Sequence, residues 1–361
     1  MPLQGLFETV WWVVLGLTAV NFALFAAIVV QREQWVVHRR LRERIARRIA
    51  PVVDRLLHGD DIGQAVDELR PLFKVLPRQV RPVTAWLLLD GLGAADAGTQ
   101  AAVRKALGDY RVIEQAERAT RRRMAWRRVL ACDVLGTIGT ATSVGVLVQR
   151  LRDKRAEVRT AAVQALGELG SPAAAAPLTE LFLRQDGVPI GVVHDSLSRL
   201  GAAGADAFRQ GLRSPRVTVR ITSCFGIAGQ AETVGRGAVI ALLEQRLRTD
   251  GEACVRAAAA SAMRFVPGDA APAALLGAAH DRAAPVRRST AKSLAAFDDP
   301  AAVEALGPMA SDSDRETALR SAESLLVLSE RRAAGAQARE ALGASHAWTV
   351  DSVRATAELG A

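Results

Sequence analysis

Apolar and polar residues alternate with a helical period along most of the chain, and one phrase returns about every 31 residues. Its clearest copy is DKRAEVRTAAVQALGELG, residues 153–170. The apolar positions of this copy are Val158, Ala162, Leu166 and Leu169. Residues spaced by three or four positions share one face of a helix, so the pattern predicts an amphipathic helix with a buried stripe.

The residues between these helices predict a second, preceding helix in each copy. Gly170 ends the helix of the clearest copy, Ser171 predicts a cap, and Pro172 suits the first position of the next helix. An aspartate stands in the turn before each second helix, where we expect its carboxylate to accept hydrogen bonds from free backbone N–H groups. These aspartates are Asp153, Asp250, Asp281 and Asp312.

Neighbouring copies keep the same offsets, except at one interruption. We place Leu197, Phe225 and Met263 at the position of Leu166, which gives steps of 31, 28 and 38 residues. The long step predicts an extended helix or loop, and it marks either a functional site or a neutral insertion. We count eight two-helix units between residues 121 and 361. A helical repeat of fixed period predicts an α-solenoid.

The phrase D-x-x-x-x-V-R-x-x-A-x-x-A-L-G-x-L-G resembles the HEAT repeat, in the short bacterial form that is also found in phycobilin lyases. The resemblance covers about two thirds of the chain. It implies an all-α fold whose second helices line a concave, protein-binding face. It also implies a ladder of Asp and Arg side chains between adjacent repeats, for which it favours a structural role over partner contact. The ladder residues would be Arg128, Asp153, Arg159, Asp250, Arg256, Asp281, Arg287 and Asp312.

The front of the chain has a different pattern. Residues 9–30, TVWWVVLGLTAVNFALFAAIVV, contain no charged side chain. A helix of this length is about 33 Å long and crosses a hydrocarbon core of about 30 Å, so we predict a transmembrane anchor over residues 1–31. Asn21 either bonds to another membrane helix or is tolerated within an apolar span. The aromatic residues placed like interfacial anchors are Trp11, Trp12 and Trp35.

A basic segment follows the predicted span. Residues 31–50 carry seven Arg and two Glu, so the positive-inside rule places the N-terminus outside and everything after the span in the cytoplasm. Helical spacing of apolar positions predicts a juxtamembrane amphipathic helix over residues 32–58. This helix binds anionic headgroups, serves as a stop-transfer flank, or opens the soluble domain with a solvated face. The basic residues predicted at the interface are Arg39, Arg40, Arg44, Arg47 and Arg48.

Residues 59–120 fit the repeat poorly. Their pattern is helical, but Pro71, Pro77 and Pro82 interrupt it. We expect a divergent helical cap that packs on the first repeat, with the repeat array occupying residues 121–361. A terminal capping helix is expected at residues 348–359.

Composition narrows the chemistry. The net charge of +9 comes almost wholly from Arg, and aromatic residues make up only 4% of the chain, a composition that suits packed helices better than sheets. Three cysteines without CxxC spacing and five scattered histidines predict no disulfide framework, metal site or cofactor. His194, Asp195 and Ser196 have the residue types of a catalytic triad, but adjacent helical residues point in different directions. We therefore expect no enzyme.

One dense basic cluster stands at the start of the array, in RATRRRMAWRR. It faces the membrane, binds an acidic partner, or is only solvated. The candidate partner residues in it are Arg121, Arg122, Arg123 and Arg127. Elsewhere the positive charge is too dilute to require phosphate partners, which makes nucleic-acid binding the third interpretation of the chain.

The sequence thus predicts a single-pass protein of the inner bacterial membrane whose cytoplasmic solenoid binds and positions a protein partner. Tethering raises the effective concentration of a partner in the same membrane. A membrane enzyme such as a polysaccharide-synthesising glycosyltransferase is one such partner. The alternative is a bilin lyase-like or other enzymatic HEAT protein.

Overall fold

The structure is a computed structural model. It describes residues 47, 49–58, 62–75, 81–91, 98–99, 102–103, 107, 111–266, 268, 273–330 and 335–344. Within these residues every regular element is an α-helix or a short 3₁₀-helix. The chain divides into two compact units, Met1–Ala116 and Glu117–Ala361, each described here by itself.

The first unit contains a helical segment over residues 49–58, α2 (Ile62–Val75) and α3 (Arg81–Gly91), and its last residues begin α5 (Val112–Ala119). Its buried side chains include Leu56, Leu69, Phe73 and Leu88. Pro71 lies inside α2 and does not end it, contrary to the interruption predicted there. Leu69 and Phe73, buried on either side of Pro71, hold the helix against the core despite the lost backbone hydrogen bond.

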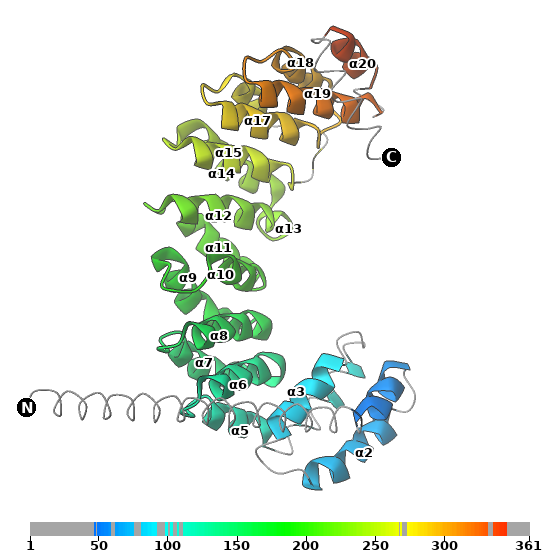
Figure 1. Cartoon of the computed structure of the whole chain (residues 1–361), viewed down its shortest axis with the longest axis vertical. Coiled ribbons are helices and arrows are strands. Elements are labelled where there is room, and N and C mark those ends of the chain that lie inside the picture. The colour runs from blue at the N-terminus through cyan, green and yellow to red at the C-terminus, as the bar shows by residue number, and fades with distance from the viewer. Residues whose placement is uncertain are drawn as a thin grey trace, which may run out of the picture. The chain divides into compact units, whose positions relative to one another are not determined.

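The second unit is a stack of helix pairs (Figure 1). The second helices of the pairs are α6 (Ala125–Ile138), α8 (Ala156–Leu169), α10 (Ile190–Ser198), α12 (Val217–Ala228), α15 (Ala253–Met263), α17 (Ala284–Leu294) and α19 (Arg315–Ser329). The first helices are α7 (Val144–Arg150), α9 (Ala175–Arg184), α11 (Ala202–Gly211), α14 (Arg236–Thr249), α16 (Ala273–Gly277), α18 (Pro300–Met309) and α20 (Gly335–Ala344). Short elements η1 (Ala141–Ser143), η2 (Pro172–Ala174), α13 (Ala231–Val234) and η3 (Ala278–His280) complete them.

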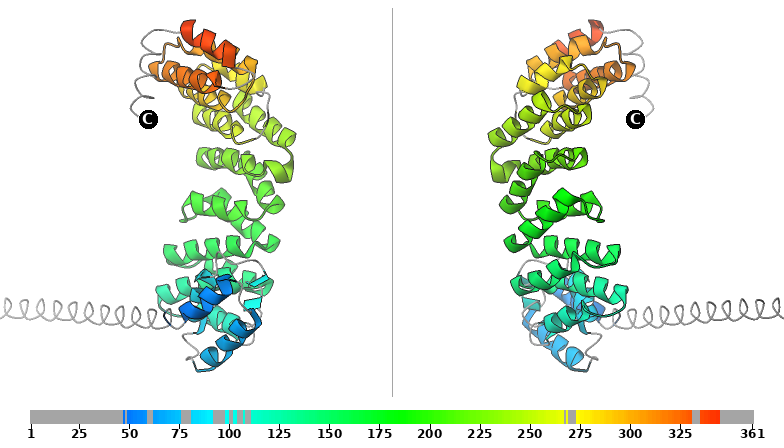
Figure 2. Two further views of the ribbon diagram at one scale, coloured as in Figure 1. Left: turned by 90° about the vertical axis from the view of Figure 1, so that its right-hand side faces the viewer. Right: turned by 90° about the vertical axis from the view of Figure 1, so that its left-hand side faces the viewer.

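The pairs form two layers, which the side views separate (Figure 2). Each second helix packs on the next, from α6 on α8 through to α17 on α19, and α9, α11, α14, α16, α18 and α20 belong to the other layer. The predicted α-solenoid is confirmed. The described residues contain seven second helices, and the eighth, predicted at 348–359, lies outside them.

The buried stripe of the second helices is formed by one repeated apolar position. Its occupants, all fully buried, are Leu135, Leu166, Leu197, Ile227, Met263, Leu294 and Leu325. Burying each such side chain contributes about 1.5–3 kcal/mol, so this column holds the layer together. Gly167, which follows Leu166, marks a close approach, because a Cβ there would lie 2.7 Å from the backbone of Ser196 in the next helix.

The repeat alignment at the interruption is wrong by two residues. Ile227 is fully buried at the position of Leu166, whereas the predicted Phe225 is only half-buried. The steps along the column are therefore 31, 30 and 36 residues. The sequence VTVR, residues 217–220, carries the valine–arginine pair that the alignment missed. The longer step holds α13 and the long helix α14 rather than an unstructured loop.

The helix ends follow the predictions in part. Gly170 ends α8 in the left-handed conformation, with φ 60°, as glycine at this position favours. Ser171 makes no capping hydrogen bond, so that prediction is wrong. Pro172 begins the 3₁₀-turn η2, and this turn separates Ser171 from the start of α9.

Candidate partner-binding surface

A ladder of arginine and aspartate side chains joins consecutive second helices. In each rung, an arginine of one second helix donates to the aspartate in the turn before the next second helix. The rungs are Arg128–Asp153, Arg220–Asp250, Arg256–Asp281 and Arg287–Asp312. The last three are two-pronged, since Nε and a terminal nitrogen of the arginine donate to both carboxylate oxygens at 2.6–3.1 Å. Forked pairs of this kind fix orientation as well as distance.

Each rung also fixes the turn in which its aspartate lies. The rung aspartates accept from the backbone N–H two residues later, at 2.7–3.1 Å, as the sequence predicts. In every repeat that has an arginine at the ladder position, the same guanidinium donates to the carbonyl six residues earlier, at 2.9–3.0 Å. One aspartate and one arginine thus set both the turn and its contact with the neighbouring repeat.

Three of the rung aspartates have lowered pKa values and are ionised at neutral pH. Burial by itself would raise the pKa of Asp153 and of Asp281, but their arginine partners and a backbone N–H outweigh it and lower both pKa values below the usual range. Hydrogen bonds from Arg287 are the main cause that lowers the pKa of Asp312. These three rungs therefore stabilise the folded unit at neutral pH, because their carboxylates are ionised there.

Two ladder positions differ from the resemblance. Arg159 does not meet a carboxylate, because its Nη2 donates to the backbone carbonyl of Gly187 at 2.9 Å. Arg220, which was not predicted, supplies the partner of Asp250. The VTVR phrase carried this signal, and the misplaced alignment at Phe225 hid it.

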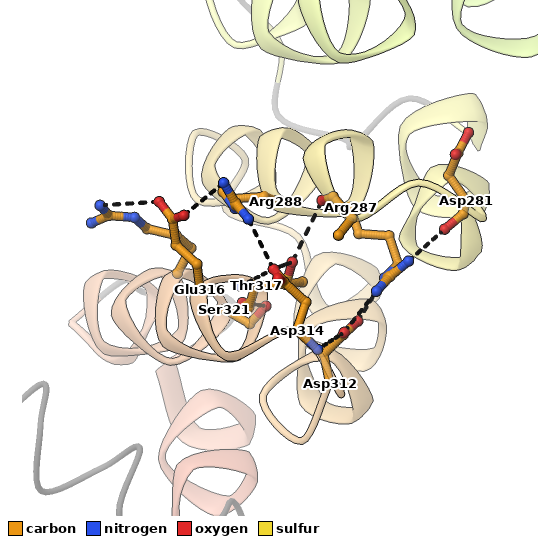
Figure 3. Close-up of polar contacts among 10 residues, drawn as sticks. Asp281, Arg287, Arg288, Asp312, Asp314, Glu316, Thr317 and Ser321 are labelled. Carbon is orange, nitrogen blue, oxygen red and sulfur yellow. Dashed lines mark hydrogen bonds and ion pairs between the residues drawn. The ribbon is translucent and has the colours of Figure 1, made fainter. Parts of the chain in front are cut away.

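The polar contacts extend from the last rung along α17 and α19 (Figure 3). Arg288 donates to Asp314 at 3.1 Å and lies 2.6 Å from Glu316. Asp314 also caps α19 by accepting from the backbone N–H and the hydroxyl of Thr317, at 2.9 and 2.6 Å. These bonds lower the pKa of Asp314 to about 2. The carboxylates of Asp312, Asp314 and Glu316 all have partners within the unit, which is the arrangement of a structural element, although Arg288 Nε is buried without a hydrogen-bond partner.

An aromatic pair lies on the second-helix layer, outside this polar network. Phe225 of α12 meets Phe265, just after α15, edge to face with ring centroids 6.5 Å apart. Phe265 is 54% exposed, and the guanidinium of Arg264 lies over its ring at 4.6 Å from the centroid. Aromatic residues and arginine are enriched in protein-binding interfaces, so this pair is a candidate binding site.

The flanks of this pair carry opposite charges. Phe225 stands five residues after the ladder position of its repeat, and the same position in the other repeats forms one stripe along the layer. The stripe reads Asp133, Gln164, Asp195, Phe225, Ser261, Lys292 and Glu323. It is acidic before the aromatic pair and basic on the repeat after α15. A partner that crosses the layer therefore meets an acidic, an apolar and a basic region in turn.

One carboxyl of the stripe is strongly perturbed. Loss of water around the half-buried Asp133 raises its pKa to about 6, and the nearby carboxylate of Glu168 adds to the effect. Desolvation raises the pKa of Glu168 as well. This acidic end of the stripe is a place where a basic group of a partner would gain a counter-charge.

The other predicted site residues lie as follows. The basic cluster spans the turn between α5 and α6, where Arg121, Arg122 and Arg123 are exposed, and the first turn of α6, where Arg127 is half-exposed. Of the predicted interface residues only Arg47 is described, and it is exposed. The residues outside the described part are Trp11, Trp12, Trp35, Arg39, Arg40, Arg44 and Arg48. No helix of the described part is long and apolar enough to cross a bilayer, and residues 9–30 lie outside that part.

The described residues offer few groupings that could take part in catalysis or metal binding. His194 Nδ1 lies 3.1 Å from Asp195 Oδ1, but its buried Nε2 has no hydrogen-bond partner and its ring packs on Phe208. Ser196 is buried, so these residues do not form a relay. No group of His, Cys, Asp and Glu in the described part is arranged to hold a metal ion. Cys132 and Cys224 are buried, and burial raises the pKa of each to about 12.

Paired helices, a repeated buried column and inter-repeat charge rungs define an α-solenoid. Residues 116–190 and 205–295 match the family of HEAT repeats, and residues 286–312 match the PBS lyase HEAT-like repeat. The protein is a HEAT-repeat protein.

Several solved structures align with the chain at low identity and low TM-score. Human deoxyhypusine hydroxylase in complex with glycerol is 18% identical, covers 80% of this chain and 98% of its own, and has a TM-score of 0.31. An engineered protein is 16% identical over 80% and 91% of the two chains, with a TM-score of 0.38. The complex of CpcE and CpcF of phycocyanin lyase from Nostoc sp. PCC7120 is 19% identical over 75% and 94%, with a TM-score of 0.29. No curated protein matches the sequence. Similarities at this level carry no functional argument.

Proposed function

We propose that this HEAT-repeat protein is a binding scaffold, and that it holds a protein segment on the second-helix layer around Phe225 and Phe265. The observation that carries the proposal is the exposed aromatic pair across α12 and α15, with Phe265 54% exposed under Arg264. The rungs on α12, α15 and α17 hold these helices in fixed register. A surface preorganised in this way loses little conformational entropy on binding.

The charges beside the aromatic pair specify the partner segment. An apolar side chain fits the pair itself. An acidic residue on one side of it would face Arg264 and Lys292, and a basic residue on the other side would face Asp195. Charge complementarity of this kind sets orientation and speeds encounter more than it adds affinity.

The proposal includes the location of the scaffold. Residues 9–30 would anchor the chain in the inner membrane of a bacterium with the solenoid in the cytoplasm, since the uncharged run is followed by seven arginines. The partner is then a protein of the same membrane, such as a glycosyltransferase, whose encounter with the solenoid is favoured by confinement to one surface. The scaffold acts by binding and not by catalysis.

Site-specific crosslinking in cells tests the binding surface. A photoreactive amino acid at position 265 of the full chain should give a crosslinked product that Phe225→Ala weakens at least tenfold. The matched control places the same group at Val327, which is 48% exposed on α19. Equal crosslinking at both positions, or no effect of Phe225→Ala, would contradict the proposed site.

The location has its own test. A fluorescent protein fused after residue 361 should fluoresce and remain with the membrane fraction, whereas a chain that starts at His58 should leave it. A mild-detergent pull-down should recover less partner with the shorter chain. If both chains recover the same partner equally, positioning at the membrane is not part of the function.

The second candidate function is that of a bilin lyase-like protein. The observation that favours it is the match of residues 286–312 to the PBS lyase HEAT-like repeat. The full chain mixed with a bilin would then show a shifted visible absorption band that persists through gel filtration. Absence of the band would leave the scaffold as the better explanation.

A further inference from the structure

The turn that opens the repeat array is the most basic part of the solenoid. Residues 121–127 carry four arginines and no acidic side chain. Two large apolar side chains lie among them, with Met124 47% exposed and Trp126 44% exposed. The guanidinium of Arg127 lies 5.1 Å from the centre of the Trp126 ring. The exposed arginines of the turn and the exposed tryptophan of the first turn of α6 are therefore close together in the chain.

This turn differs from the later ones in its place on the ladder. Arg122 stands six residues before Arg128, where Asp153 stands before Arg159 and Asp250 before Arg256. The first rung aspartate is Asp153, which pairs with Arg128 of α6. The turn before α6 has arginine where the turns before α8, α15, α17 and α19 have a rung aspartate.

The backbone of the turn is nevertheless fixed. Arg128 donates to the carbonyls of Arg122 and Arg123, at 3.0 and 2.9 Å, while it also pairs with Asp153. The carbonyls are held on the inner side by the first rung. The side chains of Arg121, Arg122 and Arg123 are exposed and make no ion pair within the described residues.

The equivalent turns of the other repeats carry less positive charge. The turn of residues 152–158 carries Arg152, Lys154 and Arg155 against Asp153 and Glu157, a net of +1. The turn of residues 249–255 carries Asp250 and Glu252 with no basic residue, a net of −2. The turn of residues 213–219 carries Arg213 and Arg216, a net of +2. The first turn, at +4, is thus the most basic of these turns, and the neutral and acidic turns between and after the basic ones interrupt any basic track.

We propose that residues 121–127 dock on the surface of an anionic phospholipid bilayer. Arginine meets lipid phosphates, and tryptophan and methionine enter the boundary between headgroups and acyl chains, the depth that amphipathic aromatic side chains prefer. A nucleic acid presents a continuous line of phosphates and favours a basic track, which the charge of the later turns does not supply. This contact is separate from the partner site at Phe225 and Phe265, and it gives the solenoid a second point of attachment.

A fluorescent probe near the patch tests the contact in the full chain. Met124→Cys combined with Cys254→Ser gives one exposed thiol, since Cys132 and Cys224 are buried with pKa values of about 12. The full chain is combined with phosphatidylcholine vesicles that contain brominated acyl chains, with and without phosphatidylglycerol. We expect the bromines to quench the probe only when phosphatidylglycerol is present, and high salt to reduce the quenching.

The native thiol supplies the matched control position. Cys254 is exposed and stands one residue before the buried Val255, as Trp126 stands one residue before Arg127. A probe on Cys254 lies on the acidic turn and should not be quenched. Quenching of both probes to the same extent would overturn the proposal, because it would show vesicle contact without preference for the basic turn.

Matched charge variants complete the test. Each basic residue contributes about fivefold to binding near an anionic surface, so replacing Arg121, Arg122 and Arg123 with Gln should weaken the lipid contact about a hundredfold. Replacing Arg213, Arg216 and Arg282, three exposed arginines of later turns, with Gln removes the same charge and should leave the quenching unchanged. Equal loss in both variants would overturn the proposal.

Two further outcomes would also overturn it. The first is failure of the full chain to associate with phosphatidylglycerol vesicles. The second is tight binding of a single-stranded oligonucleotide that the Arg121, Arg122 and Arg123 variant loses, which would assign the patch to nucleic acid. The crosslink at position 265 is independent of all these results, so failure here and failure of the scaffold proposal are distinguishable.

Discussion

Two stretches of the solenoid hold their repeats in register by different means. From α12 to α19 each repeat is joined to the next by an ionic rung, with forked contacts at Arg220, Arg256 and Arg287. Between α8 and α12 there is no such rung. Arg159 bonds to a carbonyl, and Ile190 stands at the ladder position of α10.

Neutral contacts and large side chains replace the rungs in that gap. Gln185 donates to the hydroxyl of Thr218 at 2.6 Å, and Gln230 donates to the carbonyl of Ser198 at 2.9 Å. Phe208 is fully buried and packs edge to face on Phe182, with centroids 5.8 Å apart. Register between repeats is therefore set by charge in one stretch and by the fit of side chains in the other.

The largest effect should come from the packing in the gap. Phe208→Ala removes a fully buried ring that touches Phe182 and His194, and we expect it to lower the free energy of unfolding by about 3–5 kcal/mol. Chemical denaturation followed by circular dichroism measures the loss. Phe225→Ala, at a half-buried ring on the second helix of the same pair, should cost about 1 kcal/mol or less. Similar losses in the two variants would show that Phe208 is not the centre of the packing.

Gly226 gives a second test of the packing around Phe208. A Cβ at this position would lie 2.5 Å from the Phe208 ring, so Gly226→Ala should cost about 1–3 kcal/mol through overpacking. The cost should largely vanish in the Phe208→Ala background, where the ring is absent. Additive losses in the double variant would contradict the contact, since residues that touch give non-additive effects.

A rung of the ladder should give the next largest effect. Asp281→Ala leaves the guanidinium of Arg256, a residue only 5% exposed, without its carboxylate. Breaking a buried pair by removing one partner costs about 3–5 kcal/mol, and we expect about 2–3 kcal/mol here because the pair lies at a turn. Asp186→Ala is the matched control. Asp186 is exposed, and it is the carbonyl of the neighbouring Gly187 that accepts from Arg159, so this substitution removes a carboxylate without breaking a rung. The control should change stability by about 0.5 kcal/mol or less.

The two stretches also differ in how far the sequence predicts them. The ladder could be predicted from the sequence because its aspartates and arginines recur at fixed offsets. Three of the four observed rungs join residues that the sequence analysis named. The stretch between α8 and α12 could not be predicted in the same way, because its repeats lack the paired aspartate and arginine. The apolar residues Phe225 and Ile227 also compete there for the same repeat position. The exposed aromatic pair was missed for a related reason. Sequence periodicity identifies the buried face of a helix, but it does not show that Phe265, just past a helix end, meets Phe225 from a neighbouring repeat.

A cap in the ladder stretch should give a smaller effect. Asp314→Ala removes the acceptor of the Thr317 N–H and the partner of Arg288, and should cost about 1 kcal/mol. Asp314→Asn keeps the cap and removes only the charge, so it should cost a few tenths of that. The pKa of Asp314 is about 2 in the folded chain, below the usual value of about 3.9. Its contribution is therefore fully present above about pH 4 and is lost as the pH falls through about 2.

The smallest expected effect is a gain in stability, whereas the preceding substitutions lower it. The pKa of Asp133 is raised to about 6, so the folded state binds this proton more tightly than the unfolded chain does. Stability from this group therefore increases as the pH falls from about 7 to about 4, the reverse of the ladder aspartates. Asp133→Asn removes the buried charge, and should raise the melting temperature at pH 7 while leaving it nearly unchanged at pH 4.

Thermal unfolding of the wild type and of the Asp133→Asn chain at pH 4, 5, 6 and 7 measures this difference. Asp195→Asn is the control, because its side chain is 76% exposed at the same stripe position, so it removes a carboxylate of the stripe without removing a buried charge. A melting temperature that Asp133→Asn lowers at pH 7 would mean that the carboxylate is paired rather than desolvated. The acidic end of the stripe would then offer no uncompensated charge to a partner, and the partner segment would not need a basic residue there.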